Sequence, residues 1–176
     1  MGVTFKNLGI LLAALFASGT WLGTSWGDGS PPTFPPVSNK TAATECSACH
    51  MAYPAGLLPA RSWTRMMREL DNHFGEDASL SPEETLAITR YLQDNAADSV
   101  HANDRMRRIA GGIAPNAAPQ RFTETTYFGY LHDEVPAYVW KRAKIGSRAN
   151  CIACHTRAET GSFVEREIKI PKDPAP

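Results

Sequence analysis

Residues 45–50 read ECSACH and residues 150–155 read NCIACH, so the pattern Cys-x-x-Cys-His occurs twice. The chain contains four cysteines, and all of them lie in these two motifs. Cys-x-x-Cys-His is the attachment signature of c-type haem. If the motif is helical, its positions i, i+3 and i+4 share one face, so both thiols can form thioethers with one porphyrin while the imidazole binds the iron. The sequence therefore predicts two covalently bound haem c groups, on Cys46, Cys49 and His50 and on Cys151, Cys154 and His155.

Two other kinds of site, a zinc site and a redox dithiol, also use cysteine or histidine. Cysteine and histidine are common zinc ligands, but a zinc site does not require histidine directly after the second cysteine. A thioredoxin-like dithiol would need a βαβ context, and the sequence around both motifs has no such pattern. Haem attachment is the interpretation that explains why the histidine is present both times.

The N-terminal segment indicates export. Residues 1–27 combine Lys6 with an apolar run from Leu8 to Ala17 and small residues after it, which predicts a secretory signal peptide. The apolar character continues to Trp26, so an uncleaved membrane anchor is the alternative. Either outcome places the protein in the periplasm. Residues 28–39 are rich in proline and predict an extended linker rather than packed chain, with the folded part beginning near Lys40.

We expect a mainly α fold with few or no strands. Apolar residues recur at helical spacing in residues 61–73 and 82–97, and Ser81, Pro82 and Glu84 form a helix-start signal with a capping box. Residues 98–120 have the composition of an inter-domain connection, and the C-terminal SFVEREIKIP predicts extended chain. We predict a first haem domain at 40–104 and a second at 105–176.

Charge is unevenly distributed along the chain, although the net charge is zero. Residues 40–104 hold five Lys or Arg against ten Asp or Glu, whereas residues 105–176 hold twelve against seven. Two regions of opposite sign can dock different partners, or each other. We favour docking of the two regions on each other, because nothing in the sequence names a partner. The basic residues are dispersed along the sequence, so we expect no binding to nucleic acid, and contact with a membrane only through an uncleaved anchor.

Beyond the two motifs, three stretches resemble the bacterial dihaem cytochrome c family. They are ECSACHMAYPAGLLPARSWTRMMRELDNHFGEDASLSPEE, TYFGYLHDEVPAYVW and NCIACHTRAETGSFVEREIKIP, which together cover most of the chain after residue 45. The resemblance implies an electron carrier whose two low-spin haems are each ligated by two histidines. It also implies partners among other periplasmic or membrane cytochromes.

Two more iron ligands are then needed, and three histidines remain. His73 ends the first predicted helix, a place from which small cytochromes c commonly supply the distal ligand. His132 lies in the aromatic stretch YFGYLHDEVP, where Asp133 and Glu134 could accept its second ring proton. His101 lies in the polar SVHAND and is expected on the surface.

We assign His73 to the first iron with His50, and His132 to the second with His155, although a crossed pairing would use the same residues. Methionine is the competing ligand. Met66 and Met67 are expected on a helix, where at least one of them should pack in the core. Met51 directly follows the proximal histidine and is too close to it to reach the opposite side of the iron. The function expected is electron transfer without enzymatic chemistry. The alternative is a haem enzyme or gas sensor with one open iron position.

Overall fold

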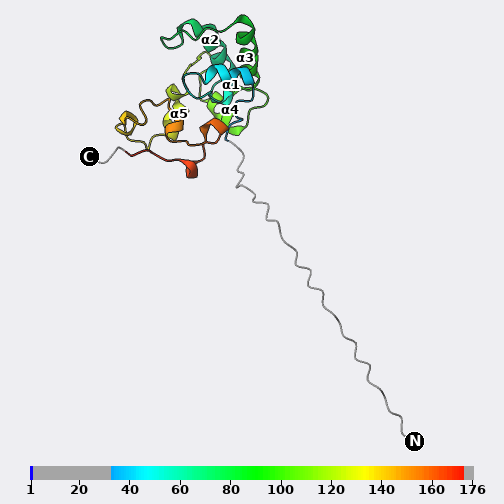
Figure 1. The fold of residues 1–176 in the computed structure, drawn as a ribbon, viewed down its shortest axis with the longest axis vertical. Helices are drawn as coiled ribbons and strands as arrows, with labels where there is room; N and C mark the ends of the chain where they lie inside the picture. Colours follow the sequence, from blue (N-terminus) through cyan, green and yellow to red (C-terminus); the bar gives the residue numbers. More distant parts are fainter. Residues whose placement is uncertain (2–32, 173–176) are drawn as a thin grey trace. The chain divides into compact units, whose positions relative to one another are not determined.

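The computed structural model describes Met1 and residues 33–172. The predicted signal peptide and most of the predicted linker lie outside the described residues. Residues 33–172 belong to one compact unit. The prediction of a mainly α fold is confirmed, because these residues contain five α-helices, seven short 3-10 helices and no named strand (Figure 1).

Three helices build the N-terminal half of the core. They are α1 (Lys40–Cys46), α2 (Ala60–Arg68) and α3 (Pro82–Asp94). Trp63 and Met67 of α2 pack against Ile88 and Leu92 of α3, and Ala42 of α1 joins the same buried cluster. Four of these side chains are large and apolar, and burying each contributes about 1.5–3 kcal/mol to stability. Met67 is therefore a core residue, as expected.

The predicted helix boundaries are only partly correct. The helix expected at 61–73 ends at Arg68 and is followed by the 3-10 helix η2 (Leu70–Asn72). The predicted capping box is confirmed, because the Ser81 hydroxyl accepts from the Glu84 amide while the Glu84 carboxylate accepts from the Ser81 amide. This box satisfies two backbone donors that a helix start otherwise leaves unpaired.

The segment 98–120 is more than a connection. It contains α4 (Asp104–Gly111), whose Met106 and Ile109 are among the most deeply buried side chains. Met106 lies directly over Gly56 in the 3-10 helix η1 (Ala55–Leu57), where a Cβ would come within 2.8 Å of the methionine methyl group. The interpretation as a linker was wrong here because the Gly- and Pro-rich composition masked a short amphipathic helix. The predicted division at residue 104/105 falls at the start of α4, and the two-domain organisation stays a prediction.

The end of the predicted proline-rich linker is also packed. Phe34 is only 3% exposed, and its backbone amide donates to the carbonyl of Gly161 at 3.0 Å. Its ring meets Phe163 edge to face at 5.4 Å between centroids. The folded part therefore begins before Lys40, because one large apolar side chain outweighs the proline-rich composition around it.

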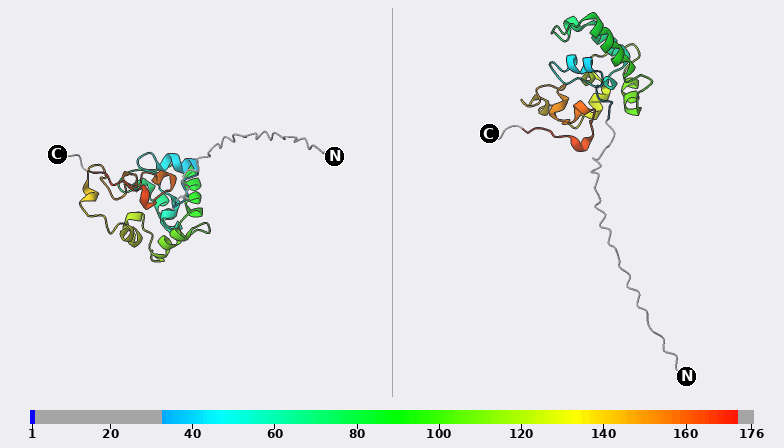
Figure 2. Two further views of the ribbon diagram at one scale, coloured as in Figure 1. Left: turned by 90° about the horizontal axis from the view of Figure 1, so that it is seen from below. Right: turned by 45° about the vertical axis from the view of Figure 1, so that its right-hand side comes forward.

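The C-terminal third consists of short turns around α5 (Thr126–Leu131). It includes the 3-10 helices η3 (Phe122–Glu124), η4 (Val139–Lys141), η5 (Cys151–Ala153), η6 (Ala158–Thr160) and η7 (Glu165–Glu167). The tail expected to be extended contains η7 and one isolated bridge between His155 and Ile168. Figure 2 shows this region as irregular chain beside the helices. No helix of the described residues is long and apolar enough to cross a membrane.

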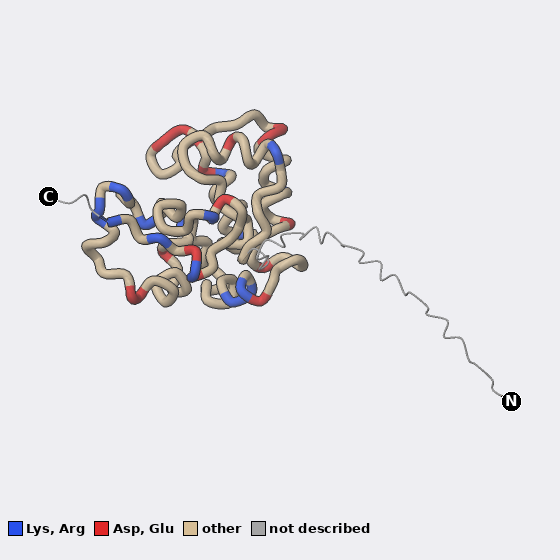
Figure 3. Tube along the Cα trace, turned by 60° about the horizontal axis from the view of Figure 1, so that its bottom comes forward, with Lys and Arg blue, Asp and Glu red and all other residues tan. Residues whose placement is uncertain are grey.

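Lys and Arg residues cluster near the C-terminal end of the described chain. In Figure 3 several basic segments gather near the C-terminal end of the trace. A hydrogen bond from Arg142 to the carbonyl of Pro171, at 2.9 Å, brings the basic loop 141–148 beside the basic tail 166–172. The tertiary structure thus concentrates positive charge that is spread along the sequence.

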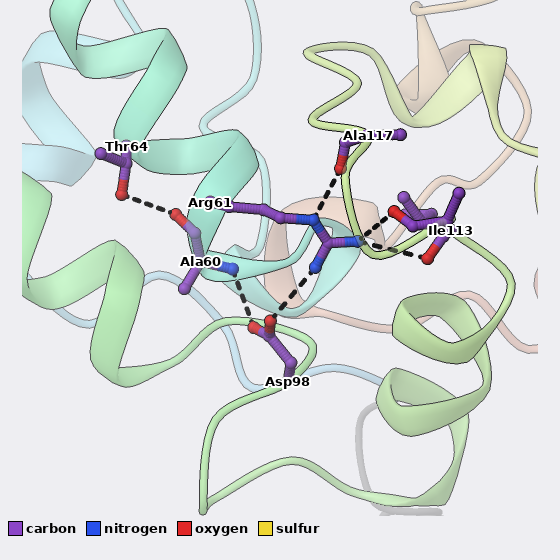
Figure 4. A network of polar contacts seen from close by, with 7 residues as sticks. Ala60, Arg61, Thr64, Asp98, Ile113 and Ala117 are labelled. Carbon is purple, nitrogen blue, oxygen red and sulfur yellow. Dashed lines mark hydrogen bonds and ion pairs between the residues drawn. The ribbon is translucent and has the colours of Figure 1, made fainter.

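Arg61 joins α2 to the segment after α4 (Figure 4). Its guanidinium donates to the backbone carbonyls of Ala117, Ala114 and Ile113 at 2.6, 3.0 and 3.2 Å. It also lies 3.5 Å from the carboxylate of Asp98, which accepts from the first amide of α2. One cation therefore satisfies three carbonyls of a loop that has no regular secondary structure.

We expect Arg61→Ala to lower the free energy of unfolding by about 2 kcal/mol, because hydrogen bonds to charged groups contribute more than neutral ones. Arg65→Ala is the matched control, since Arg65 of the same helix makes an exposed ion pair with the C-cap residue Glu69. Such pairs contribute about 0.5 kcal/mol. Denaturant titration of the purified haem protein measures both, and an equal loss in the two variants would contradict the role of Arg61.

Candidate functional site

The first Cys-x-x-Cys-His motif is presented by a helix end and a turn. Helix α1 ends at Cys46, and residues 47–49 form a turn, so the motif is not the continuous helix that the spacing alone suggested. Cys46 is partly buried and Cys49 is exposed, and neither forms a disulfide. Burial, with a smaller contribution from the charge of Glu45, raises the pKa of the Cys46 thiol. Of the two thiols, that of Cys49 is therefore the more accessible to a bound group.

His73 faces the histidine of this motif. The ring centroids of His50 and His73 lie 6.1 Å apart with an interplanar angle of 29°. The backbone of His73 exchanges two hydrogen bonds with Glu76, at 2.7 and 3.2 Å, which closes a tight loop. In this loop Phe74 adopts a left-handed conformation with φ 57°. The Arg121 guanidinium lies 3.8 Å from the centre of the Phe74 ring and covers it.

The second motif forms a tighter turn. Residues Cys151–Ala153 make the 3-10 helix η5, and the His155 amide donates to the Cys151 carbonyl at 2.8 Å. The His155 ring packs on Phe163 at 5.1 Å, and its Nδ1 atom is buried without a hydrogen-bond partner in the described structure. Burial raises the pKa of the Cys151 thiol to about 11.

His132 lies at the C-cap of α5, where an aromatic wall holds its ring. The ring stacks on Phe128 at 4.1 Å and lies 5.7 Å from Trp140. Its Nδ1 is 2.9 Å from the Phe128 carbonyl. The expectation that Asp133 or Glu134 accepts this ring proton is wrong, because both side chains are exposed and the helix carbonyl one turn back is nearer. This carbonyl fixes the ring orientation.

The second pair repeats the separation of the first. The ring centroids of His132 and His155 lie 6.1 Å apart, with an interplanar angle of 80°. Burial lowers the pKa of both histidines, and the charge of His132 lowers that of His155 further. Burial also lowers the pKa of His73, with smaller contributions from the charges of His50 and Arg121. Neutral imidazole, which these shifts favour, is the form that binds a metal.

The spacing of each pair fits one metal ion between two imidazoles. With metal–nitrogen distances of about 2.0 Å, two ring centres on opposite sides of an ion stand about 6 Å apart. Several large apolar side chains in the segments that carry these histidines are exposed: Phe74, Tyr130, Leu131, Tyr138 and Ile152. Within the described residues, no group of three or more His, Cys, Asp or Glu side chains could hold a metal ion. Two facing imidazoles with two thiols and uncovered apolar surface fit a flat apolar group such as a porphyrin.

A family model described as dihaem cytochrome c matches residues 42–163. The chain belongs to the dihaem cytochrome c family. It is therefore a haem-binding cytochrome, and membership of this family implies two haem groups. Cytochromes c are generally electron carriers. The family match covers both histidine pairs and both Cys-x-x-Cys motifs.

Solved structures similar to this dihaem cytochrome come from two bacteria. A diheme cytochrome c from Rhodobacter sphaeroides is 48% identical, with a TM-score of 0.65, over 73% of this chain and 99% of that one. A diheme cytochrome type c from Shewanella baltica OS155 is 38% identical, with a TM-score of 0.62, over 77% of this chain and 94% of that one. Among curated proteins, none matches the chain.

The structure also places residues that the sequence did not single out. His101 is exposed, as expected. Arg148 lies 5.1 Å from the centre of the Phe128 ring and 5.4 Å from that of Trp140, behind the wall that holds His132. Tyr53 lies beside His50. Neither Tyr53 nor Arg148 belongs to a sequence motif, so only its position in the fold identifies it.

Proposed function

We propose that this dihaem cytochrome is a periplasmic electron carrier with two covalently attached haems, each held between two histidines. The observation that supports it is the pairing of the rings. His50 faces His73, and His132 faces His155, both at 6.1 Å between centroids. In this proposal Cys46 and Cys49 bind the first haem, and Cys151 and Cys154 bind the second.

When bound between two imidazoles, a haem c takes up and releases single electrons at its iron with no bond made or broken. The chain's part is to keep the ligands fixed. The Phe128 carbonyl holds the orientation of His132, and Phe163 supports His155. The loop closed by Glu76 does the same for His73. Rigid ligands keep the reorganisation on electron transfer small.

The alternative is a haem enzyme or gas sensor with one open iron position, which carbon monoxide distinguishes. We expect the visible spectrum of the reduced protein to stay unchanged when the gas is added, because two protein ligands leave no free position on either iron. A rapid shift of the Soret band would contradict the closed sites and favour the alternative. Release of the haem-stained protein by osmotic shock tests the periplasmic location, and retention in spheroplasts would count against it.

We further propose that other redox proteins are the partners and that they dock with an acidic face. The basic loop 141–148 and the basic tail 166–172 lie together through the bond from Arg142 to Pro171. The tail also reaches the second haem motif, since the Lys169 amide donates to the Cys154 carbonyl at 2.9 Å. Positive charge beside an attachment motif attracts an anionic reaction partner.

We expect the anion hexacyanoferrate(III) to oxidise the reduced protein more slowly after Lys141, Lys144 and Lys169 are all changed to Glu. These three side chains are exposed. The matched control changes three exposed arginines of α4, Arg105, Arg107 and Arg108, to Glu. Stopped-flow rates at low and high salt measure the effect. An equal decrease in both triple variants would assign the effect to net charge rather than to this surface.

A further inference from the structure

One side chain touches both haem motifs. Tyr53 lies three residues after His50, and its ring centroid is 5.0 Å from that of the histidine with an interplanar angle of 36°. At this distance the two rings are in contact. Tyr53 therefore supports the proximal imidazole of the first site from the side.

The other end of the same side chain reaches the second site. The Tyr53 hydroxyl donates to the carbonyl of Ala149 at 2.7 Å, across 96 positions of sequence. The same carbonyl accepts from the amide of Cys151 at 2.9 Å. One acceptor atom thus joins the phenol of Tyr53 to the first residue of the second attachment motif.

The surroundings of Tyr53 keep it in this role. Its side chain is partly buried and packs against both apolar clusters of the described chain, one around Trp63 and Ile88 and the other around Met106 and Ile109. The Tyr53 hydroxyl carries a proton at neutral pH, as an ordinary phenol does, and is a hydrogen-bond donor there.

We propose that Tyr53 is a positioning residue that couples the two haem sites, holding the Ala149–Cys151 turn with its hydroxyl and the His50 ring with its aromatic face. This inference rests on the proposed function, because it needs both sites to hold haem. If the inference is right, the midpoint potential of the second haem depends on Tyr53, which lies in the loop after the first motif. The route has three contacts: the His50 ring with the Tyr53 ring, the Tyr53 hydroxyl with the Ala149 carbonyl, and the same carbonyl with the Cys151 amide. Cys151 then joins the route to the second haem through its covalent bond.

Tyr53→Phe tests this with the loss of one oxygen atom. The ring beside His50 remains, while the Ala149 carbonyl loses one of its two donors. We expect the Cys151 amide to exchange with deuterium about fivefold faster, as for the loss of one neutral hydrogen bond. A looser turn admits water, which stabilises the more positive oxidised iron, so the midpoint potential of the second haem should fall.

Tyr91→Phe is the matched control. The Tyr91 hydroxyl accepts from the Ser38 amide at 3.2 Å, and its ring packs on the Trp63 cluster, as the ring of Tyr53 does. Tyr91→Phe therefore removes a comparable hydroxyl from the same cluster without removing a hydrogen bond to a haem motif. Tyr53→Leu also removes the ring, and we expect it to change the spectrum of the first haem as well. Electron paramagnetic resonance separates the two haems because their imidazole planes make different angles, 29° and 80°.

The measurements are the two midpoint potentials, the resonance spectrum of the oxidised protein and the exchange rate of the Cys151 amide. A lower second potential and faster exchange in Tyr53→Phe, with both unchanged in Tyr91→Phe, would support the coupling. If Tyr53→Phe only lowers the melting temperature, as Tyr91→Phe does, and leaves potentials and spectra unchanged, the inference is wrong. Failure of the proposed function is seen separately, as open or missing haems in the unaltered protein.

Discussion

His73→Ala and His132→Ala are each expected to turn one of the two haems from low-spin to high-spin and to let it bind carbon monoxide. Each removes the imidazole whose ring faces the histidine of a Cys-x-x-Cys-His motif at 6.1 Å. No other histidine of the described chain has a ring contact with His50 or His155, so the vacated position has no replacement imidazole. The spectrum of the reduced variant under carbon monoxide should show about half of the haem responding.

His101→Ala is the control for this pair. His101 is exposed and belongs to neither pair, so its loss should leave the spectrum unchanged and both irons closed to the gas. A response to carbon monoxide in His101→Ala, without one in either of the other two variants, would contradict the ligand assignment. Since the uncrossed pairing is the one that the ring distances favour, His73→Ala should alter only the haem bound at Cys46 and Cys49.

Changing both Cys151 and Cys154 to Ala is expected to remove one of the two covalently bound haems. Both thiols lie in the turn that precedes His155, and the chain has no other cysteine near this motif. The pyridine haemochrome of denatured, acetone-extracted protein should fall to about half, because only thioether-bound haem survives extraction. We also expect the protein to be less stable, since Ile152 of the same turn is exposed and would lose the apolar partner that a haem attached there supplies.

Ile152→Ala is the matched control for the cysteine variant. It alters the same turn and removes a partly exposed apolar side chain, but it leaves both thiols. It should keep both covalent haems. Full haem content in the double cysteine variant would mean that the second motif does not bind haem covalently.

Local sequence determined much of this protein. The two Cys-x-x-Cys-His motifs are complete within five residues each, so their chemistry can be read without any tertiary contact. The capping box of Ser81 and Glu84 is equally local, and the structure confirms it. A mainly α fold followed from the spacing of apolar residues in 61–73 and 82–97, since that periodicity depends only on the geometry of a helix.

Contacts between residues far apart in the chain could not be predicted from the sequence. Phe34 packs against Phe163, and Arg61 binds carbonyls near residue 115, although nothing in either segment indicates its partner. Helix α4 was masked by the Gly- and Pro-rich composition around it, and its packing place, over a glycine 50 positions earlier that leaves room for Met106, has no local signal. Composition predicted that residues 28–39 and 98–120 are linkers, but both segments contain side chains that pack against remote parts of the chain.

The candidate site divides in the same way. The sequence alone identified the four thiols and the two adjacent histidines as the candidate attachment residues, because the Cys-x-x-Cys-His spacing is local. Which other histidines face them depends on how loops 23 residues apart are folded back, and only the tertiary structure places His73 opposite His50 and His132 opposite His155. It also decided that Tyr53 joins the two sites, because a hydrogen bond across 96 positions leaves no local pattern in the chain.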